Sequence, residues 1–154
     1  MPGVAGKGHL MAEKSGEALT WTFESAIDLR THQFKALLLD SNGRVNLCGG
    51  REQTYIGALQ NKPNSLEHAT VIYLGITKGV AGLAITRGDL LTVRSGFFIP
   101  GARAVPQTST LSGSNAFTNP GSGIVLVAQA LDTVASGGIV EMLTKGLFSV
   151  VNSN

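Results

Sequence analysis

The residues of this chain that could do chemistry are few and lie far apart in the sequence. Cys48 is the single cysteine, and the three histidines are His9, His32 and His68. A single cysteine excludes a disulfide within the chain. Cys48 follows alternating apolar residues of a predicted strand, so we expect a small buried side chain rather than a nucleophile. None of the histidines belongs to a cluster at ligand spacing, and we therefore predict no metal site.

Two glycine-rich stretches resemble ligand-binding loops but lack necessary parts. Residues 3–8 have neither a Ser or Thr after Lys7 nor a preceding strand, and a phosphate-binding loop needs both. Residues 121–123 lack the third glycine and the following helix of a dinucleotide loop or nucleophile elbow. We therefore predict that the chain is not an enzyme and binds no cofactor.

Several polar residues are predicted to shape turns. Asp40, Asp89 and Asp132 each lie at a strand end or turn, where the carboxylate can accept backbone N–H groups. Arg87-Gly88-Asp89 is the tripeptide that integrins read in extracellular ligands, but the N-terminus carries no apolar signal core. A turn in which Gly88 supplies a positive φ accounts for this tripeptide.

The composition favours a protein that is partly covered by partners. Charged residues make up 14% of the 154 residues, against about 25% in ordinary soluble domains. Low charge is typical of surfaces that are buried on assembly, and a weakly soluble monomer is the alternative. A net charge of +2 without a Lys/Arg run predicts no nucleic-acid partner. No segment approaches the ~20 apolar residues of a membrane span, so we expect no membrane partner.

The elements that must position any functional surface are predicted to be strands. Leu19, Trp21 and Phe23 alternate with threonines, which is the period of a strand. Asn42-Gly43 predicts a hairpin with a type I′ turn. Twenty glycines and frequent turns predict a compact β-barrel or sandwich of about ten short strands.

The strands are predicted to form two degenerate repeats, at about 34–79 and 87–146. The comparison that suggests the repeats pairs Leu37 with Leu90 and Leu59 with Leu131. Residues 1–16 are predicted to be a flexible N-terminal arm, and residues 17–154 a single β domain. The loop from 106 to 123 is unusually long, which is typical of a functional or mobile segment.

The second repeat resembles the tailed-phage head decoration proteins, also called capsid cement proteins. The resemblance covers roughly residues 85–143. It rests on Arg87-Gly88-Asp89-Leu90-Leu91-Thr92-Val93 before Ser95-Gly96, and on the closing run VAQALDTVASGGIVEML at 127–143. It implies a structural protein that is made in the host cytoplasm and binds the outer surface of the virion. There it would bridge major capsid subunits and stabilise the shell. The arm and the long loop depart from the shorter members of that family.

The partner contacts that we predict are apolar residues of the arm, the first strand and the long loop. They are Leu10, Leu19, Trp21, Phe23 and Phe117. Aromatic residues dominate interface energetics, although Trp21 fits a core position equally well. The expected partners are the major capsid protein and further copies of the chain, as a homotrimer before a dimer. The alternative function is a small-ligand or carbohydrate-binding β module that uses the loop at 107–123.

Overall fold

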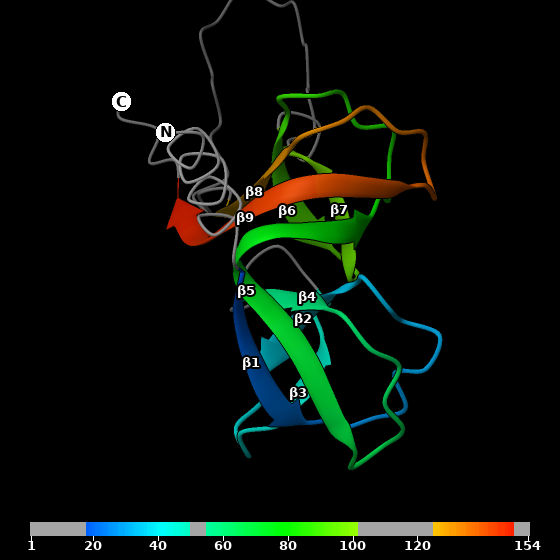
Figure 1. Ribbon diagram of the computed structural model, residues 1–154, viewed down its shortest axis with the longest axis vertical. Coiled ribbons are helices and arrows are strands. Elements are labelled where there is room, and N and C mark those ends of the chain that lie inside the picture. The colour runs from blue at the N-terminus through cyan, green and yellow to red at the C-terminus, as the bar shows by residue number, and fades with distance from the viewer. Residues whose placement is uncertain (1–17, 50–54, 102–124, 150–154) are drawn as a thin grey trace, which may run out of the picture.

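The computed structural model describes residues 18–49, 55–101 and 125–149, with the backbone alone from residue 145 onward (Figure 1). The named elements of these residues are all β-strands, which confirms the predicted all-β class. They are β1 (Leu19–Glu24), β2 (Ala36–Leu39), β3 (Val45–Leu47), β4 (Tyr55–Leu59), β5 (His68–Val80), β6 (Leu90–Arg94), β7 (Phe97–Pro100), β8 (Val125–Ala130) and β9 (Ile139–Ser149). The predicted arm at 1–16 lies outside the described residues, and the division into arm and domain stays a prediction.

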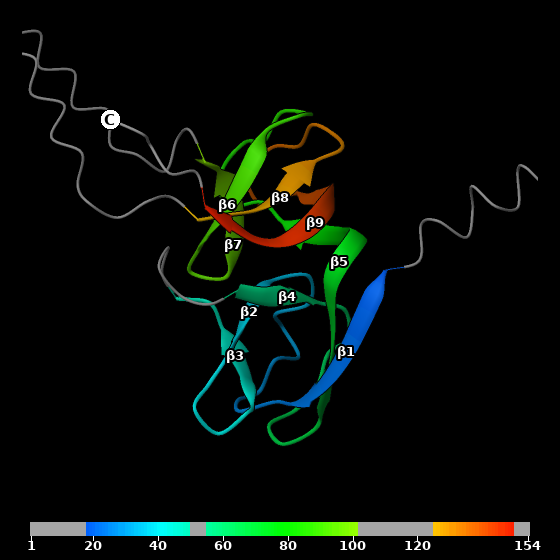
Figure 2. The same cartoon turned by 90° about the vertical axis from the view of Figure 1, so that its left-hand side faces the viewer.

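The strands form a single curled sheet (Figure 2). Eight of them follow the order β3-β2-β4-β5-β9-β8-β6-β7, and β1 joins by pairing with β5. The described residues form nine strands, against the predicted ten or so. Each half of the order holds a hairpin, a third strand and a long closing strand. The sheet is therefore built twice on one plan.

Strand β5 belongs to both halves of the sheet. Its first part pairs with β1 and β4, and its second part pairs with β9. The strand bends sharply between these parts (Figure 1). Gly75 lies at the change of partner with φ 113°, and a Cβ there would approach the Cα of Ala18 to 2.8 Å. Glycine is needed at this position because both the dihedral angle and the close approach exclude a side chain.

We call β1 through the first part of β5 the first half, and the rest of β5 through β9 the second half. Each half is closed by one parallel bridge, Ser25 with Val45 and Ala81 with Phe98. The bonds around these bridges are repeated. Ser25 N donates to Glu67 O and Leu66 N donates to Ser25 O, while Ala81 N donates to Gly138 O and Gly137 N donates to Ala81 O.

The repeated hydrogen bonds also fix which residues are equivalent. Phe34 N donates to Leu59 O, and Gly88 N donates to Ala130 O. Leu59 therefore matches Ala130 rather than the predicted Leu131. In the same way Leu37 lies opposite Gly57, and Leu91 lies opposite Ala128. Leu37 thus matches Leu91 and not Leu90, so the predicted register of the repeat is wrong by one residue in both segments.

The β2–β3 turn differs from the prediction. Only Gly43 has a positive φ (75°) in the β2–β3 turn, and Asp40 Oδ1 accepts Asn42 N and Arg44 N at 2.8 and 2.9 Å. The Asp40 carboxylate thus holds a longer loop, and the predicted type I′ turn at Asn42-Gly43 is wrong. The β6–β7 turn has the type I′ signature instead, with φ 51° at Ser95 and 78° at Gly96.

Apolar packing joins the two halves. One cluster lies within the first half around Leu29, Leu37 and Val71. The other mixes both halves, because Ala36, Cys48, Tyr55 and Ala58 pack with second-half residues. The Tyr55 ring meets the edge of Phe98 at 6.0 Å, and its hydroxyl lies 3.1 Å from Thr144 Oγ1. The shared cluster makes one body of the two halves.

Gly57 offers a direct test of this packing. A methyl group at Gly57 would overlap Ile72 O and lie 2.5 Å from Val71 Cγ1, whereas one at Gly43 meets nothing within 4 Å. Both glycines have positive φ, and Gly43→Ala adds a dihedral cost of about 1–2 kcal/mol without a steric overlap. We expect Gly57→Ala to lower the free energy of unfolding by at least ~1 kcal/mol more than Gly43→Ala in urea titrations. Equal losses would contradict the close approach of β4 to β5.

Candidate partner-binding surface

Strand β1 carries the predicted contact residues that the structure describes. Leu10 and Phe117 lie outside the described residues, whereas Leu19, Trp21 and Phe23 all belong to β1. Within the described part of the chain, β1 pairs along its length with β5 alone. Its other edge thus faces outward along the side of the first half (Figure 1). An unpaired strand edge is able to accept a further strand.

The structure places these three residues on opposite faces of β1. Trp21 and Phe23 lie opposite Val71 and Ala69, which are both fully buried, so they share the inner face of the sheet. A register shift follows Leu19, which lies opposite the exposed Leu74 on the outer face. The predicted contacts are therefore not one patch but two.

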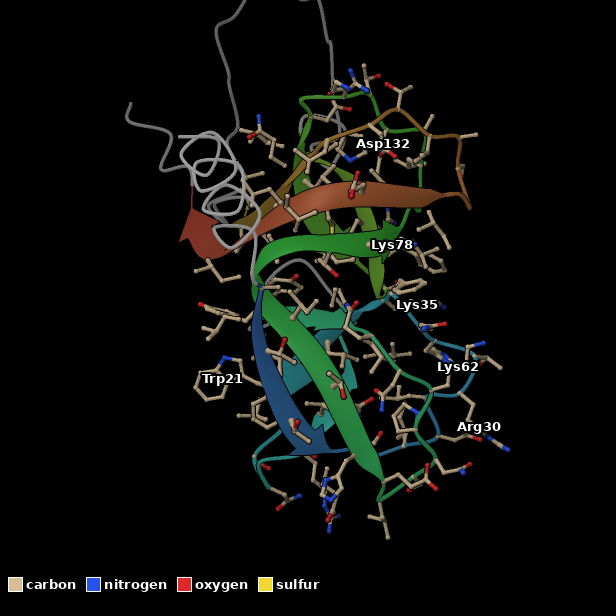
Figure 3. All side chains as sticks on the ribbon, in the orientation of Figure 1. Trp21, Arg30, Lys35, Lys62, Lys78 and Asp132 are labelled. Atoms are coloured by element: carbon tan, nitrogen blue, oxygen red, sulfur yellow. The ribbon has the colours of Figure 1, made fainter. Side chains whose placement is uncertain are left out.

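Trp21 and Phe23, the two residues on the inner face, differ in how deeply they are buried. The rings of Trp21 and Phe23 stack with centroids 6.2 Å apart and planes within 8°. Phe23 packs against the first-half cluster, whereas Trp21 is 52% exposed and points away from the body beside β1 (Figure 3). Trp21 is thus a surface residue whose ring stacks on that of Phe23.

The outer face carries an apolar strip that sequence reasoning missed. We define the outer strip as Leu19, Leu74 and Ile76, which are 48%, 46% and 46% exposed. Residues of β5 alternate, with Val71 and Thr77 buried on the inner face and the strip residues on the other face. This alternation is visible in the sequence, but the run of apolar residues at 71–76 also fits a strand that is buried on both faces.

Charged groups lie at the C-terminal end of β1. Glu24 Oε1 and Arg44 Nε approach to 2.6 Å, and both side chains are partly exposed. On the side of the first half away from β1 (Figure 3), hydrogen bonds from Arg30 lower the pKa of the exposed Asp28 carboxyl to about 2. The apolar surface of β1 thus borders a short paired-charge region, which suits a protein contact with a polar rim.

Burial shifts the pKa values of Cys48 and His32, two of the side chains that could do chemistry. Burial raises the pKa of the Cys48 thiol to about 11, which keeps it neutral and unreactive at neutral pH. Burial lowers the pKa of His32, whose Nδ1 lies 2.8 Å from Thr31 Oγ1. Among residues 18–49, 55–101 and 125–149 no group of three or more His, Cys, Asp or Glu side chains could hold a metal ion.

The three aspartates bind backbone amides as predicted. Asp40 binds the β2–β3 turn, Asp89 Oδ2 accepts Thr86 N at 2.9 Å, and Asp132 Oδ1 accepts Glu141 N at 3.0 Å. Gly88 has φ 92°, which agrees with the predicted turn at Arg87-Gly88-Asp89. These residues shape loops and do not converge on a site.

A shallow hollow of about 240 Å³ lies beside β7. Its lining is largely apolar with Arg94 as the charged side chain, and is formed by Gly82, Leu83, Arg94, Ser95, Phe97 and Ile99. The loop at 107–123, on which a ligand-binding alternative depends, lies outside the described residues.

In the described part of the chain, no helix has the length and apolar character of a membrane span.

The fold resembles that of a known phage structure. The crystal structure of the head fiber gp8.5 N base in bacteriophage phi29 superimposes with a TM-score of 0.54 at 13% identity, covering 86% of this chain and 98% of that chain. Neither a protein-family model nor a curated protein matches the sequence. At this identity the likeness shows a shared fold.

The different positions of Trp21 and Phe23 predict different effects of truncation. Trp21→Ala removes a half-exposed ring, and we expect it to lower the free energy of unfolding by less than ~1 kcal/mol. Phe23→Ala opens space above the first-half cluster, and we expect a loss of at least ~2 kcal/mol. Urea unfolding followed by circular dichroism measures both. A larger loss for Trp21→Ala would show that Trp21 is a core residue.

Proposed function

We propose that this chain is a structural protein of a tailed-phage head. It binds the outer surface of the capsid, bridges major capsid subunits and stabilises the shell. The observation that carries this proposal is the fold shared with the phi29 head fiber base over nearly all of that chain. The resemblance of residues 85–143 to capsid cement proteins supports the same role. The localisation that follows is the virion surface, after synthesis in the host cytoplasm.

The surface supports a role in assembly. Half-exposed apolar side chains lie on both faces beside β1, with Trp21 on one and the outer strip on the other. Leu10, Leu19, Trp21, Phe23 and Phe117 are the proposed contacts in the assembled particle. Large apolar side chains at a surface favour burial by a partner, since each gains ~1.5–3 kcal/mol when fully covered. A shell with many identical sites adds multivalent gain.

The unpaired edge of β1 supports attachment through an added strand. Main-chain groups on that edge can bind an extended segment of a capsid subunit without a deep pocket. Self-association completes the proposal, as a homotrimer in preference to a dimer, because local three-fold positions of a capsid match a cyclic trimer. The rigid curled sheet suits a part that resists outward pressure on the shell.

Binding to phage heads tests the function. We expect the purified protein to sediment with expanded heads that lack it and not with unexpanded precursor heads. Deletion of residues 1–15 leaves β1 intact and should weaken binding if Leu10 contributes. The deletion variant should give the same circular dichroism spectrum as the full chain, because the β-strands are kept.

Bovine serum albumin mixed with the same heads is the control for trapping. Absence of binding to expanded heads, or equal binding to both head forms, would contradict a role as a capsid-stabilising protein. Unchanged binding after the deletion would remove the arm from the contact and leave the rest of the proposal in place.

A further inference from the structure

The joint between the two halves shows how one repeat packs on the next. The β6–β7 turn of the second half touches the first half, because Gly96 O accepts Ala36 N at 2.8 Å and Gly96 N donates to Cys48 O at 2.5 Å. Beside this contact, Gln60 Nε2 donates to Thr77 Oγ1 at 2.8 Å. Val80 N donates to Phe34 O at 3.0 Å.

The joint therefore has two complementary sides. We call the side given by the first half the trailing face, with Phe34, Ala36 and Gln60, and the side given by the second half the leading face, with Thr77 and Gly96. Both sides are covered in the joint, where Ala36 is 0% and Thr77 is 5% exposed.

The first half also has an equivalent of the leading face, and the second half also has an equivalent of the trailing face. Neither of these two equivalents takes part in the joint. Trp21 lies opposite Val71 as Thr77 lies opposite Met142, so Trp21 takes the place of Thr77 on the leading face of the first half. Its turn glycine there is Gly43. On the second half, the repeated hydrogen bonds and strand pairs place three residues on the trailing face. They are Gly88 for Phe34, Leu90 for Ala36 and Leu131 for Gln60.

In the part of the chain that the structure describes, both unused faces carry exposed apolar side chains. Trp21 is 52% and Leu90 is 41% exposed. Gln60 and Thr77 make a polar contact in the joint. The equivalent residues on the two unused faces are Leu131 and Trp21. Phe34 in the joint is replaced by Gly88, around which a Cβ would meet nothing within 4 Å. The trailing face of the second half therefore has less side-chain volume at the Gly88 position than the joint has at Phe34.

The two faces lie at opposite ends of the molecule. The β6–β7 turn points at the first half, whereas the β2–β3 turn lies at the end of the first half remote from the second (Figures 1 and 2). The halves are related by a displacement with rotation and not by a two-fold axis. A further repeat can be added at either end without blocking the first contact.

We propose that a second copy of this chain occupies these faces in a head-to-tail contact. Trp21 of one copy packs against Leu90 and Leu131 of the next copy. This contact repeats the joint within one chain, where the leading face of the second half packs on the trailing face of the first half. The inference deepens the proposed self-association and rests on it. A head-to-tail contact is heterologous, so it closes into a ring only where the rotation between copies allows.

Complementation of two blocked variants tests the contact. Trp21→Lys blocks only the leading face, and Leu90→Lys only the trailing face. We expect each to weaken self-association at least ~30-fold in sedimentation velocity and to run as a monomer. An equimolar mixture should form a one-to-one dimer, because it contains one intact face of each kind. Ile139→Lys, at a 49% exposed position outside both faces, is the matched control and should assemble as the unchanged chain does.

Several results would overturn the proposal. They are a monomeric unchanged chain, unimpaired association of either variant, or two monomeric variants that do not combine on mixing. Association that is lost by Trp21→Lys and kept by Leu90→Lys would indicate a symmetric contact through Trp21 instead. Circular dichroism checks that each variant folds, and Trp21→Ser and Leu131→Lys replace any that does not. Head binding is measured on the same samples, so a failed head-to-tail contact with retained binding leaves the capsid role standing.

Discussion

Strand β5 is the constraint on which the rest of the structure depends. One continuous backbone closes the first half of the sheet and opens the second, and Gly75 allows the change of direction between them. The two parts of β5 pair with different neighbours, so one strand ties the first half of the sheet to the second. The mixed cluster around Tyr55 and Phe98 then fills the space between the halves. Rigidity of the body follows from this shared strand.

The same constraint makes the two ends of the chain unequal. The second half meets the first through Thr77 and Gly96, so these residues are small or polar and covered. The equivalent end of the first half has no earlier repeat to cover it among the described residues, and there the chain has Trp21. A repeat built only for internal packing has no use for a tryptophan at that position. An exposed ring supported by Phe23 suits a contact with another molecule.

Much of this architecture could be predicted from local patterns. Alternation identified β1, and the carboxylates of Asp40, Asp89 and Asp132 were assigned to turns. The repeat register was wrong by one residue because Leu37-Leu38 and Leu90-Leu91 can be aligned in two ways, and only hydrogen bonds decide between them. The length of β5 was not predicted, because a glycine such as Gly75 inside an apolar run does not show whether the strand continues. The outer strip was missed because an apolar residue in a strand carries no mark of which face is covered. Trp21 was identified as a contact, but its equivalence to Thr77 exists only in the folded chain.

The central claim is that this chain works as part of the outer surface of a phage head. The most direct measurement is a cryo-electron-microscopy difference map between heads with and without the protein. We expect added density on the outside of the shell, fitted by the curled sheet and placed across the junctions of neighbouring capsid subunits. Density inside the shell, or no added density at saturating protein, would contradict it.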